Sequence, residues 1–483
     1  MKREESLDTI EGAEHPLAHV HFIGIGGAGM SALARVLFKR GVAVSGSDMK
    51  ESRYSRALRK MGVDVMIGHG AENLGDADVV VYSTAIAQDN PELLAAKQRG
   101  IPMWHRAQML GYLAGDQRTI AIAGTHGKTS TSAMVTAMMR AMGQDPSFCV
   151  GGEIDGIDTN ADHGSGSYYV VEADESDGSF LHLNPYIAVI TNIEADHLDH
   201  YSGIEEIIDT FVAFMQRVDE HGFVVVPGDN HALVALAQAS GKRVVTYGSE
   251  PECDIVYRVT ERVGLGSRFE YLIDGKLVGT ALMQAPGDHM ISNGCAALAV
   301  AYCAGLDMRE AGEALSTYSG VRRRFDLIGE VAGVTVVDDY AHHPTEVAAM
   351  LKAAAELDFK RVIALFQPHR YSRTNALEHE FGSSFDGVHR VVLLDVYSAG
   401  EAPIPGVSGR TICDAILDHD SRAQVTYLPH RKDTVRYLSS LARPGDLVMT
   451  IGAGDVTAIG PELVKELTRI QDEKNAQQTE VVS

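Results

Sequence analysis

The sequence offers little material for a disulfide framework, a zinc site or a membrane anchor. Its cysteines are scattered, without a Cys-X-X-Cys spacing, at the five positions 149, 253, 295, 303 and 413. This pattern argues against disulfide staples and against a cysteine zinc site. The longest apolar run, Cys295 to Leu306, has 12 residues, whereas a membrane span needs about 20. The segment from Met1 to Glu14 is polar and acidic, unlike a signal peptide. We therefore expect a cytoplasmic protein with no membrane partner.

Positive charge is also scarce. The chain of 483 residues has 42 lysines and arginines against 65 aspartates and glutamates, which gives a formal net charge of −23. A broad nucleic-acid surface needs a basic face, so nucleic acid is not an expected partner. Anions can still bind locally, through backbone N–H groups and a few basic side chains.

Length and hydrophobic pattern predict an α/β protein of about three domains. Hydrophobic residues make up 45% of the chain, enough for a core in each domain. Strand-like runs alternate with helix-like segments, which is typical of parallel sheets. We expect strands at 19–23, 42–46, 63–67 and 79–82, then at 168–171, 187–190 and 223–226, and finally at 334–337, 361–366, 391–394 and 447–451. The polar tail 471–483 is expected to be disordered.

The most specific local pattern is Gly124-Thr-His-Gly-Lys128-Thr129-Ser130, between an apolar run and a helix-like segment. Backbone N–H groups in such a strand–turn–helix unit converge, and the helix dipole adds positive potential. Lys128 can reach a terminal phosphate, and the Thr129 hydroxyl can bind Mg²⁺. The loop is shorter than the general phosphate-loop pattern, because Ile122 stands where the first glycine would be. The alternative is a tight turn with an exposed lysine.

A second glycine loop, Gly24-X-Gly26-X-X-Gly29, precedes a predicted helix at 31–39. It matches the dinucleotide fingerprint, and Asp48 lies near the position where an acidic residue binds a ribose. This predicts a nucleotide diphosphate at a helix N-terminus, not necessarily that of NAD. A purely structural turn is the alternative.

Acidic residues follow two central strands. Glu172 to Asp177 ends one strand, and a carboxylate there can hold Mg²⁺ opposite the phosphate loop. Thr191 to Asp199 ends the next strand and contains His197, a candidate metal ligand. A solvated acidic loop and a structural histidine are the alternatives.

Three polar segments mark the last third of the chain. Arg322 to Phe325 lies at the junction of the second and third domains, where an arginine can clamp a phosphate. Asp338 to Pro344 and Gln367 to Arg373 each follow a predicted strand. Strand ends of a parallel sheet face the same edge, so these residues suit substrate positioning. An exposed basic linker and polar loops are the alternatives.

In chain order, the sequence contains GIGGAGMS, GTHGKTS, VEADESD, TNIEADHLDHY, GDHMISNGCAA, RRF, DDYAHHP and QPHRYSR. This ordered set resembles the Mur ligases of bacterial cell-wall synthesis, over nearly the whole chain from His19 to Asp455. Within that family, His21 to Met30 and Tyr397 to Pro405 resemble the branch that adds the first amino acid.

The resemblance implies three domains. These are an N-terminal Rossmann-like UDP-binding domain (1–115), a central P-loop ATPase-like domain with a mostly parallel sheet (116–325) and a C-terminal Rossmann-like domain (326–483). The first would hold the UDP end of a sugar nucleotide at Gly24, Gly26, Gly27, Gly29 and Asp48. The implied ATP-binding residues are Gly124, Thr125, His126, Gly127, Lys128, Thr129, Ser130, His289, Asn293, Arg324 and Asp338.

The resemblance also implies the chemistry. ATP and Mg²⁺ would activate the lactyl carboxylate of UDP-N-acetylmuramate as an acyl phosphate, which the amine of L-alanine attacks. Metal ligands would be Thr129, Glu172 and His197. Catalytic roles would fall to Lys128, His197, Arg324 and His342. Arg370 and Arg373 would position the amino acid or the carboxylate.

Several alternatives stay open. A recycling ligase of the same family would attach a preformed peptide to the same sugar nucleotide. A dinucleotide-dependent dehydrogenase and a non-catalytic UDP-sugar sensor also fit the first glycine loop. Several relatives carry a modified lysine near the metals, but no lysine occurs between Gly178 and His200, which leaves open the bridging ligand of a second metal. The expected assembly is a monomer or a homodimer.

Overall fold

The computed structural model describes residues 17–115, 117–176, 178–196 and 201–482. The chain forms two compact units, and each is described by itself. The first unit runs through residue 259 and also contains 269–282 and 292–318. The second contains 260–268, 283–291 and the chain from 319 onward.

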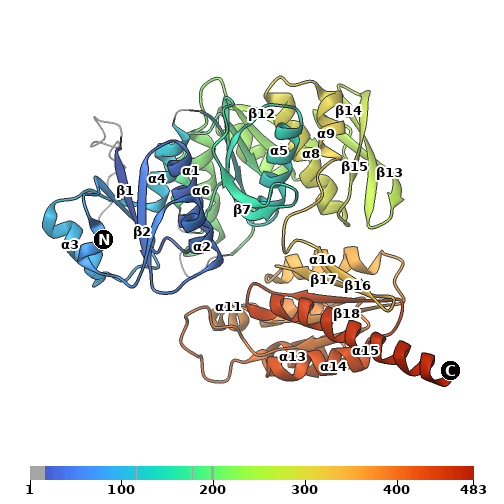
Figure 1. Cartoon of the computed structure of the whole chain (residues 1–483). Helices are drawn as coiled ribbons and strands as arrows, with labels where there is room; N and C mark the ends of the chain where they lie inside the picture. The colour runs from blue at the N-terminus through green and yellow to red at the C-terminus, as the bar shows by residue number, and fades with distance from the viewer. Residues whose placement is uncertain (1–16, 116, 177, 197–200, 483) are drawn as a thin grey trace. The chain divides into compact units, whose positions relative to one another are not determined.

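The first unit begins with a five-stranded sheet in the order β3-β2-β1-β4-β5. All its pairings are parallel, and Figure 1 shows β1 and β2 side by side. The strands are β1 (His19–Ile23), β2 (Ala43–Asp48), β3 (Asp64–Ile67), β4 (Val79–Tyr82) and β5 (Met103–His105). The helices are α1 (Ala28–Lys39), α2 (Arg53–Met61), α3 (Pro91–Arg99) and α4 (Arg106–Ala114), with a 3₁₀ turn η1 (Ala71–Leu74). The sheet order reverses between β1 and β4, which is where open α/β sheets bind ligands.

A second sheet has ten strands, in the order β15-β14-β13-β12-β11-β10-β6-β9-β7-β8. It is mixed, because β7 and β8 pair antiparallel whereas β10, β6 and β9 pair parallel. Its strands are β6 (Arg118–Ala123), β7 (Ser147–Ile154), β8 (Thr159–Asp162), β9 (Tyr168–Glu172), β10 (Ile187–Ile190), β11 (Phe223–Pro227), β12 (Arg243–Gly248), β13 (Ile255–Val263), β14 (Gly266–Ile273) and β15 (Lys276–Met283). The associated helices are α5 (Lys128–Ala141), α6 (Ile204–Gln216), α7 (His231–Ala239), α8 (Asp288–Cys303) and α9 (Met308–Leu315), with a 3₁₀ turn η2 (Ser179–His182).

The central strands of this sheet are continuous apolar runs because both of their faces are covered. Every residue of β10 is buried, and β6 is buried from Thr119 to Ala123. Strands buried on both faces need no alternation of apolar and polar residues. The polar residues therefore gather just after the strand ends, and these ends position the site.

The second unit contains a six-stranded sheet in the order β16-β17-β21-β18-β19-β20. Only β16 and β17 pair antiparallel among its described pairings. The strands are β16 (Asp326–Val331), β17 (Val334–Asp339), β18 (Arg361–Phe366), β19 (Arg390–Leu393), β20 (Val425–Tyr427) and β21 (Asp446–Ile451). The helices are α10 (Pro344–Ala355), α11 (Tyr371–Ala376), α12 (Glu378–Ser383), α13 (Gly409–His419), α14 (Arg431–Leu441) and α15 (Ile459–Val482), with a 3₁₀ turn η3 (Asp455–Ala458).

Two expectations about helices were wrong. Helix α1 begins at Ala28 rather than at Ser31, so Gly29 lies in its first turn and not in the preceding loop. Helix α15 continues to Val482, through the tail that composition predicted to be disordered. Within the described residues, no helix is both long and apolar enough to span a bilayer.

Candidate active site

The phosphate loop joins β6 to α5 by a turn that only glycine fits at two positions. Gly124 and Gly127 have φ values of +134° and +82°, in the left-handed region that favours glycine. A methyl group at Gly127 would also lie 2.9 Å from Asn293 Oδ1. The end of β10 holds the loop, because the Thr125 and His126 N–H groups donate to Asn192 O and Oδ1 at 3.1 and 2.9 Å.

Lys128, the first residue of α5, is enclosed by oxygen acceptors. Its Nζ donates to the carbonyl oxygens of Gly124 and Thr125 at 2.5 and 3.1 Å and to Glu175 Oε1 at 2.7 Å. Burial by itself lowers the pKa of Lys128, but nearby carboxylates, Glu175 first, outweigh burial and raise it. The side chain therefore carries its positive charge inside the loop, where a phosphate would bind.

The acidic segment after β9 divides its charges among different partners. Glu172 accepts hydrogen bonds from Thr129 Oγ1 at 3.1 Å and from the Gly151 N–H at 2.7 Å. Asp174 pairs with Arg106 at 2.7 Å. Burial disfavours ionisation of Asp174, but the Arg106 guanidinium outweighs it and lowers the pKa to about 2. The segment is thus built into the site and is not a solvated loop.

Thr129 and Glu172 fit a divalent cation by the chemistry of their donors. A hydroxyl and a carboxylate oxygen are hard ligands of the kind that Mg²⁺ prefers. The space beside them is narrow, since a methyl group at Gly151 would lie 2.5 Å from Glu172 Oε2 and 2.8 Å from Thr129 Oγ1. His197, the other predicted metal ligand, lies outside the described residues.

Two further predicted nucleotide contacts lie near the start of α8. The amide of Asn293 is next to the phosphate loop, at Gly127. His289 belongs to the second compact unit, where a methyl group at Gly287 would lie 2.6 Å from its Cε1 atom. Burial lowers the pKa of His289. Its contact with a nucleotide stays a prediction.

The first glycine loop is fixed by the end of β2. The Gly24 N–H donates to Ser47 O at 2.8 Å, and the Gly26 N–H donates to Asp48 Oδ2 at 2.9 Å. A methyl group at Gly26 would lie 2.8 Å from that same carboxylate oxygen. Gly27 is the N-cap of α1, so no side-chain hydrogen bond caps this end of the helix. Asp48 thus orders the loop itself, and its contact with a ribose stays a prediction.

Sequence reasoning missed Arg106. This residue begins α4, 68 positions before its partner Asp174. A methyl group at Gly29 would lie 3.9 Å from Arg106 Nη1. Arg106 therefore lies between the first glycine loop and the acidic segment after β9. No local motif surrounds it, so only the fold identifies it.

In the second unit, the two adjacent arginines differ. Arg323 is a structural ligand of Asp338, at 3.1 Å, and also donates to the Gly452 carbonyl oxygen at 2.6 Å. Both guanidinium groups lie over the Tyr340 ring, at 4.8 Å (Arg323) and 5.3 Å (Arg324) from its centroid, but among the described hydrogen bonds only that of Arg323 reaches Asp338. Asp338 is fully buried and also accepts from Thr450 Oγ1 at 2.5 Å. The nucleotide contacts of Arg324 and Asp338 stay predictions.

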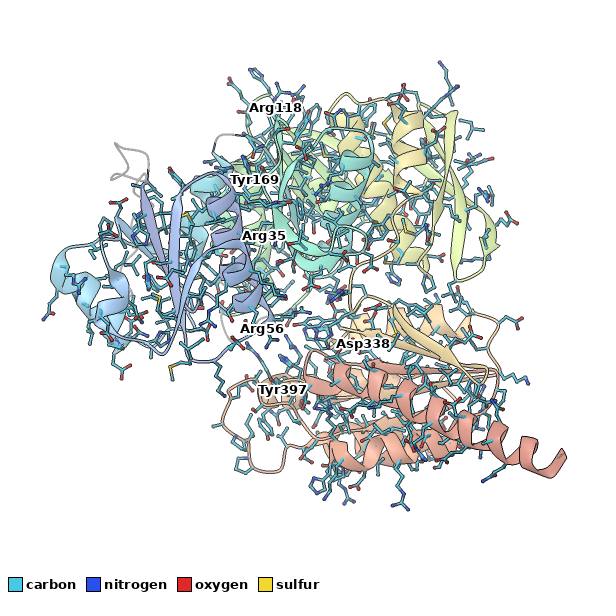
Figure 2. All side chains as sticks on the ribbon, in the orientation of Figure 1. Arg35, Arg56, Arg118, Tyr169, Asp338 and Tyr397 are labelled. Carbon is cyan, nitrogen blue, oxygen red and sulfur yellow. The ribbon has the colours of Figure 1, made fainter. Side chains whose placement is uncertain are left out.

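Aromatic and imidazole rings lie near Arg370 and Arg373, the residues predicted to position the amino acid. Figure 2 labels Asp338 and Tyr397 in this part of the second unit. The His342 and His369 ring centroids are 5.6 Å apart, and Tyr397 stacks on His369 at 5.8 Å. Burial, first of all, lowers the pKa of His342 to about 4 and of His369 to about 3. Both rings are therefore neutral at pH 7. Arg373 Nη1 lies 3.4 Å from His369 Nδ1, which puts a guanidinium beside neutral rings, a setting suited to a carboxylate.

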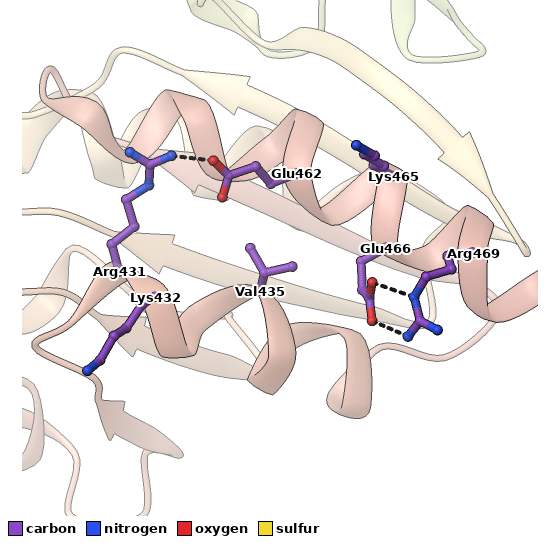
Figure 3. A pocket seen from close by; sticks show the side chains of 7 residues that line it. All are labelled: Arg431, Lys432, Val435, Glu462, Lys465, Glu466 and Arg469. Atoms are coloured by element: carbon purple, nitrogen blue, oxygen red, sulfur yellow. Dashed lines mark hydrogen bonds and ion pairs between the residues drawn. The ribbon is translucent and has the colours of Figure 1, made fainter.

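A separate surface groove lies between α14 and α15 (Figure 3). Arg431 pairs with Glu462 at 2.5 Å, and Arg469 pairs with Glu466 at 2.7 Å. None of its lining residues is among the predicted site residues. Its charged groups largely satisfy one another, so the groove resembles a solvated helix–helix surface.

Comparison with known proteins gives the family of the chain. Residues 19–118 match the Mur ligase family catalytic domain, 122–301 the Mur ligase middle domain, and 323–454 the Mur ligase glutamate ligase domain. The chain belongs to the Mur ligase family. The predicted three-domain α/β fold of this family is thereby confirmed.

Individual proteins of the family are also similar to this chain. The chain is 46% identical to UDP-N-acetylmuramate–L-alanine ligase of Pelotomaculum thermopropionicum, over 94% of this chain and 98% of that protein. It resembles the crystal structure of UDP-N-acetylmuramate–alanine ligase from Thermotoga maritima with a TM-score of 0.78 and 27% identity, over 94% and 99% of the two chains. A murein peptide ligase from Psychrobacter arcticus has a TM-score of 0.70 at 24% identity, over 93% and 99%. This last likeness shows the shared fold alone.

Proposed function

We propose that the protein joins L-alanine to the lactyl carboxylate of UDP-N-acetylmuramate and uses ATP to drive the reaction, as a step of peptidoglycan precursor synthesis. The observation that carries this proposal is the high identity, over nearly the whole chain, with a ligase of that name. The enclosed Lys128 and the Thr129–Glu172 pair supply the ATP part of the chemistry.

The chemistry follows from charge. A carboxylate resists attack by an amine because its carbonyl carbon is a poor electrophile. Transfer of the γ-phosphoryl group of ATP to a carboxylate oxygen gives an acyl phosphate and ADP. The neutral amine of alanine then attacks the acyl carbon, the amide bond forms, inorganic phosphate leaves, and the amine loses a proton to solvent. Lys128 neutralises phosphate charge during the transfer.

Thr129 and Glu172 would hold Mg²⁺, together with His197 if a second ion binds. The metal would supply further neutralisation of the phosphates. The protein groups order this place: the Gly151 N–H fixes one oxygen of Glu172 and the Thr129 hydroxyl contacts the other.

The remaining assignments follow the three domains, which we propose to extend over 1–115, 116–325 and 326–483. The first would bind the UDP diphosphate at Gly24 to Gly29, with Asp48 near the ribose. The third would supply Arg324 and His342 at the reacting groups, with Arg370 and Arg373 on the amino acid or the carboxylate. Because its substrates are a nucleotide, a sugar nucleotide and a free amino acid, we propose that the protein acts in the cytoplasm.

An ADP-release assay tests the proposal. UDP-N-acetylmuramate, L-alanine and Mg²⁺ are omitted in turn, and amide product and inorganic phosphate are measured. We expect one ADP and one phosphate for each amide, and loss of the product after each omission. Replacing L-alanine with an L-Ala-γ-D-Glu peptide distinguishes the recycling ligase: faster turnover of the peptide would overturn the assignment of the amino acid.

A further inference from the structure

Lys128 has no N–H group to spare for a nucleotide. A lysine ammonium has three donors, and three hydrogen bonds join Nζ to Gly124 O, Thr125 O and Glu175 Oε1. A lysine that bridges two phosphates of ATP must free at least two of these donors. The bond to Glu175 competes most directly with a phosphate, because the Glu175 carboxylate and the phosphate are both anions that bind the same ammonium group.

Glu175 is placed to make this competition strong. Its side chain is 4% exposed, and that of Lys128 is 15% exposed, so water screens their attraction poorly. The Tyr201 hydroxyl donates to the backbone carbonyl of Glu175, which fixes the segment that carries the carboxylate. Glu175 is thus held at the phosphate loop by contacts that do not depend on a nucleotide.

We propose that Glu175 is a positioning residue that holds Lys128 in the nucleotide-free protein and releases it when MgATP binds. This inference rests on the proposed use of ATP. The pair keeps the lysine charged and ordered before the nucleotide arrives. This arrangement lowers the apparent affinity for ATP, because only the released form of Lys128 can bind phosphate.

The neighbouring acids do not share this role. Glu172 contacts Thr129, and Asp174 pairs with Arg106. Burial raises the pKa of Glu175 and the Lys128 ammonium opposes this, whereas the pKa of Asp174 is lowered. Loss of Lys128 to a phosphate therefore leaves Glu175 able to take up a proton, which limits repulsion from the nucleotide.

The test measures ATP binding by isothermal titration calorimetry in excess Mg²⁺, without the other substrates. If Lys128 is held about nine-tenths of the time, Glu175→Gln should bind ATP about tenfold more tightly. The same variant should unfold at a lower temperature in the absence of nucleotide, because the ion pair is lost. A residue that only supports the fold would weaken ATP binding and stability together, so opposite signs identify the positioning role.

Two controls separate this role from general charge repulsion. Asp174→Asn removes a charge from the next position, where the partner is Arg106 and not Lys128, so it should not reproduce the roughly tenfold gain in ATP affinity. In a Lys128→Met background, Glu175→Gln should bring no gain, because there is no lysine to release. A gain that persists in that background, or no gain in the single variant, would overturn the proposal. Failure to form amide with normal ATP binding would instead count against the proposed function.

Discussion

Glu92 supports the first glycine loop from the first turn of α3. Its side chain is fully buried and accepts hydrogen bonds from Ser47 Oγ at 2.5 Å and from Asn73 Nδ2 at 2.6 Å. The backbone carbonyl of Ser47 in turn accepts the Gly24 N–H of the glycine loop. Replacing Glu92 with glutamine keeps the shape and an acceptor oxygen, and removes the charge. The substitution therefore tests how much that buried charge stabilises this domain.

The size of this stabilisation follows from the pKa of Glu92. Burial favours the neutral acid, but the His21 ring 3.6 Å away and the hydrogen bonds from Ser47, Asn73 and the Gly70 N–H outweigh burial and lower the pKa of Glu92 from 4.5 to about 2. A difference of this size corresponds to roughly 3 kcal/mol of folding free energy. Because the pKa in the folded state is the lower one, this stabilisation is fully present above pH 4.5 and decreases toward pH 2. About 2 kcal/mol of it should be lost by pH 3.

The assay uses the single tryptophan of the chain, Trp104. This residue is 9% exposed and lies in β5 of the same sheet, so its fluorescence reports urea unfolding of this domain. Glu92→Gln should lower the unfolding free energy by about 3 kcal/mol at pH 7 and by about 1 kcal/mol at pH 3. The control Glu72→Gln removes an exposed carboxylate from the neighbouring turn and should change little. If the unfolding free energies of wild type and Glu92→Gln differ by the same amount at pH 3 and at pH 7, the reasoning is refuted.

Three further outcomes test the site. Lys128→Ala should abolish ADP formation and leave binding of the sugar nucleotide, followed by calorimetry, within about twofold; normal ADP formation would exclude the phosphate-loop assignment. Gly26→Val should raise the KM for the sugar nucleotide at least about tenfold more than that for ATP, because a Cβ would lie 2.8 Å from Asp48 Oδ2. Unchanged sugar-nucleotide kinetics would exclude the first-loop assignment. Chelation of Mg²⁺ should stop ADP release and added Mg²⁺ should restore it, while Ca²⁺, with its longer bonds and looser geometry, should restore far less.

Secondary structure was predictable where the pattern has one physical cause. The run 187–190 is wholly apolar and 447–451 nearly so, because both faces of their strands are buried, and they match β10 and most of β21. Helix limits were less predictable. Gly29 enters the first turn of α1 because the following residues pack, and tertiary context outweighs the low helix propensity of glycine. The polar tail joins α15, whose earlier part buries Leu463 and Leu467, so the helix forms by continuation and not by its own composition.

The candidate site was predictable where its parts are adjacent in sequence. Lys128 and Thr129 are predicted from the loop, whereas the strand end predicts only that some acid of Glu172 to Asp177 binds metal, and the choice of Glu172 comes from the family resemblance. Arg106 and Glu175 acquire their roles only through partners 68 and 47 residues away. A single sequence does not carry such pairings, because an arginine before a helix and a glutamate in an acidic run have many ordinary explanations.

Charge balance explains why the acidic segment after β9 lies at the phosphate loop at all. Crowded carboxylates repel one another and raise the free energy of any fold that collects them. Asp174 and Glu175 are each compensated by a cation from elsewhere, Arg106 and Lys128. Glu172 has only neutral donors, Thr129 and the Gly151 N–H, among its described hydrogen bonds. The uncompensated charge is thus next to the hydroxyl that suits Mg²⁺, and release of Lys128 to ATP would increase the demand for a cation at the same place. Binding of nucleotide and of metal should therefore strengthen each other, as ATP titrations at stepped Mg²⁺ concentrations would show.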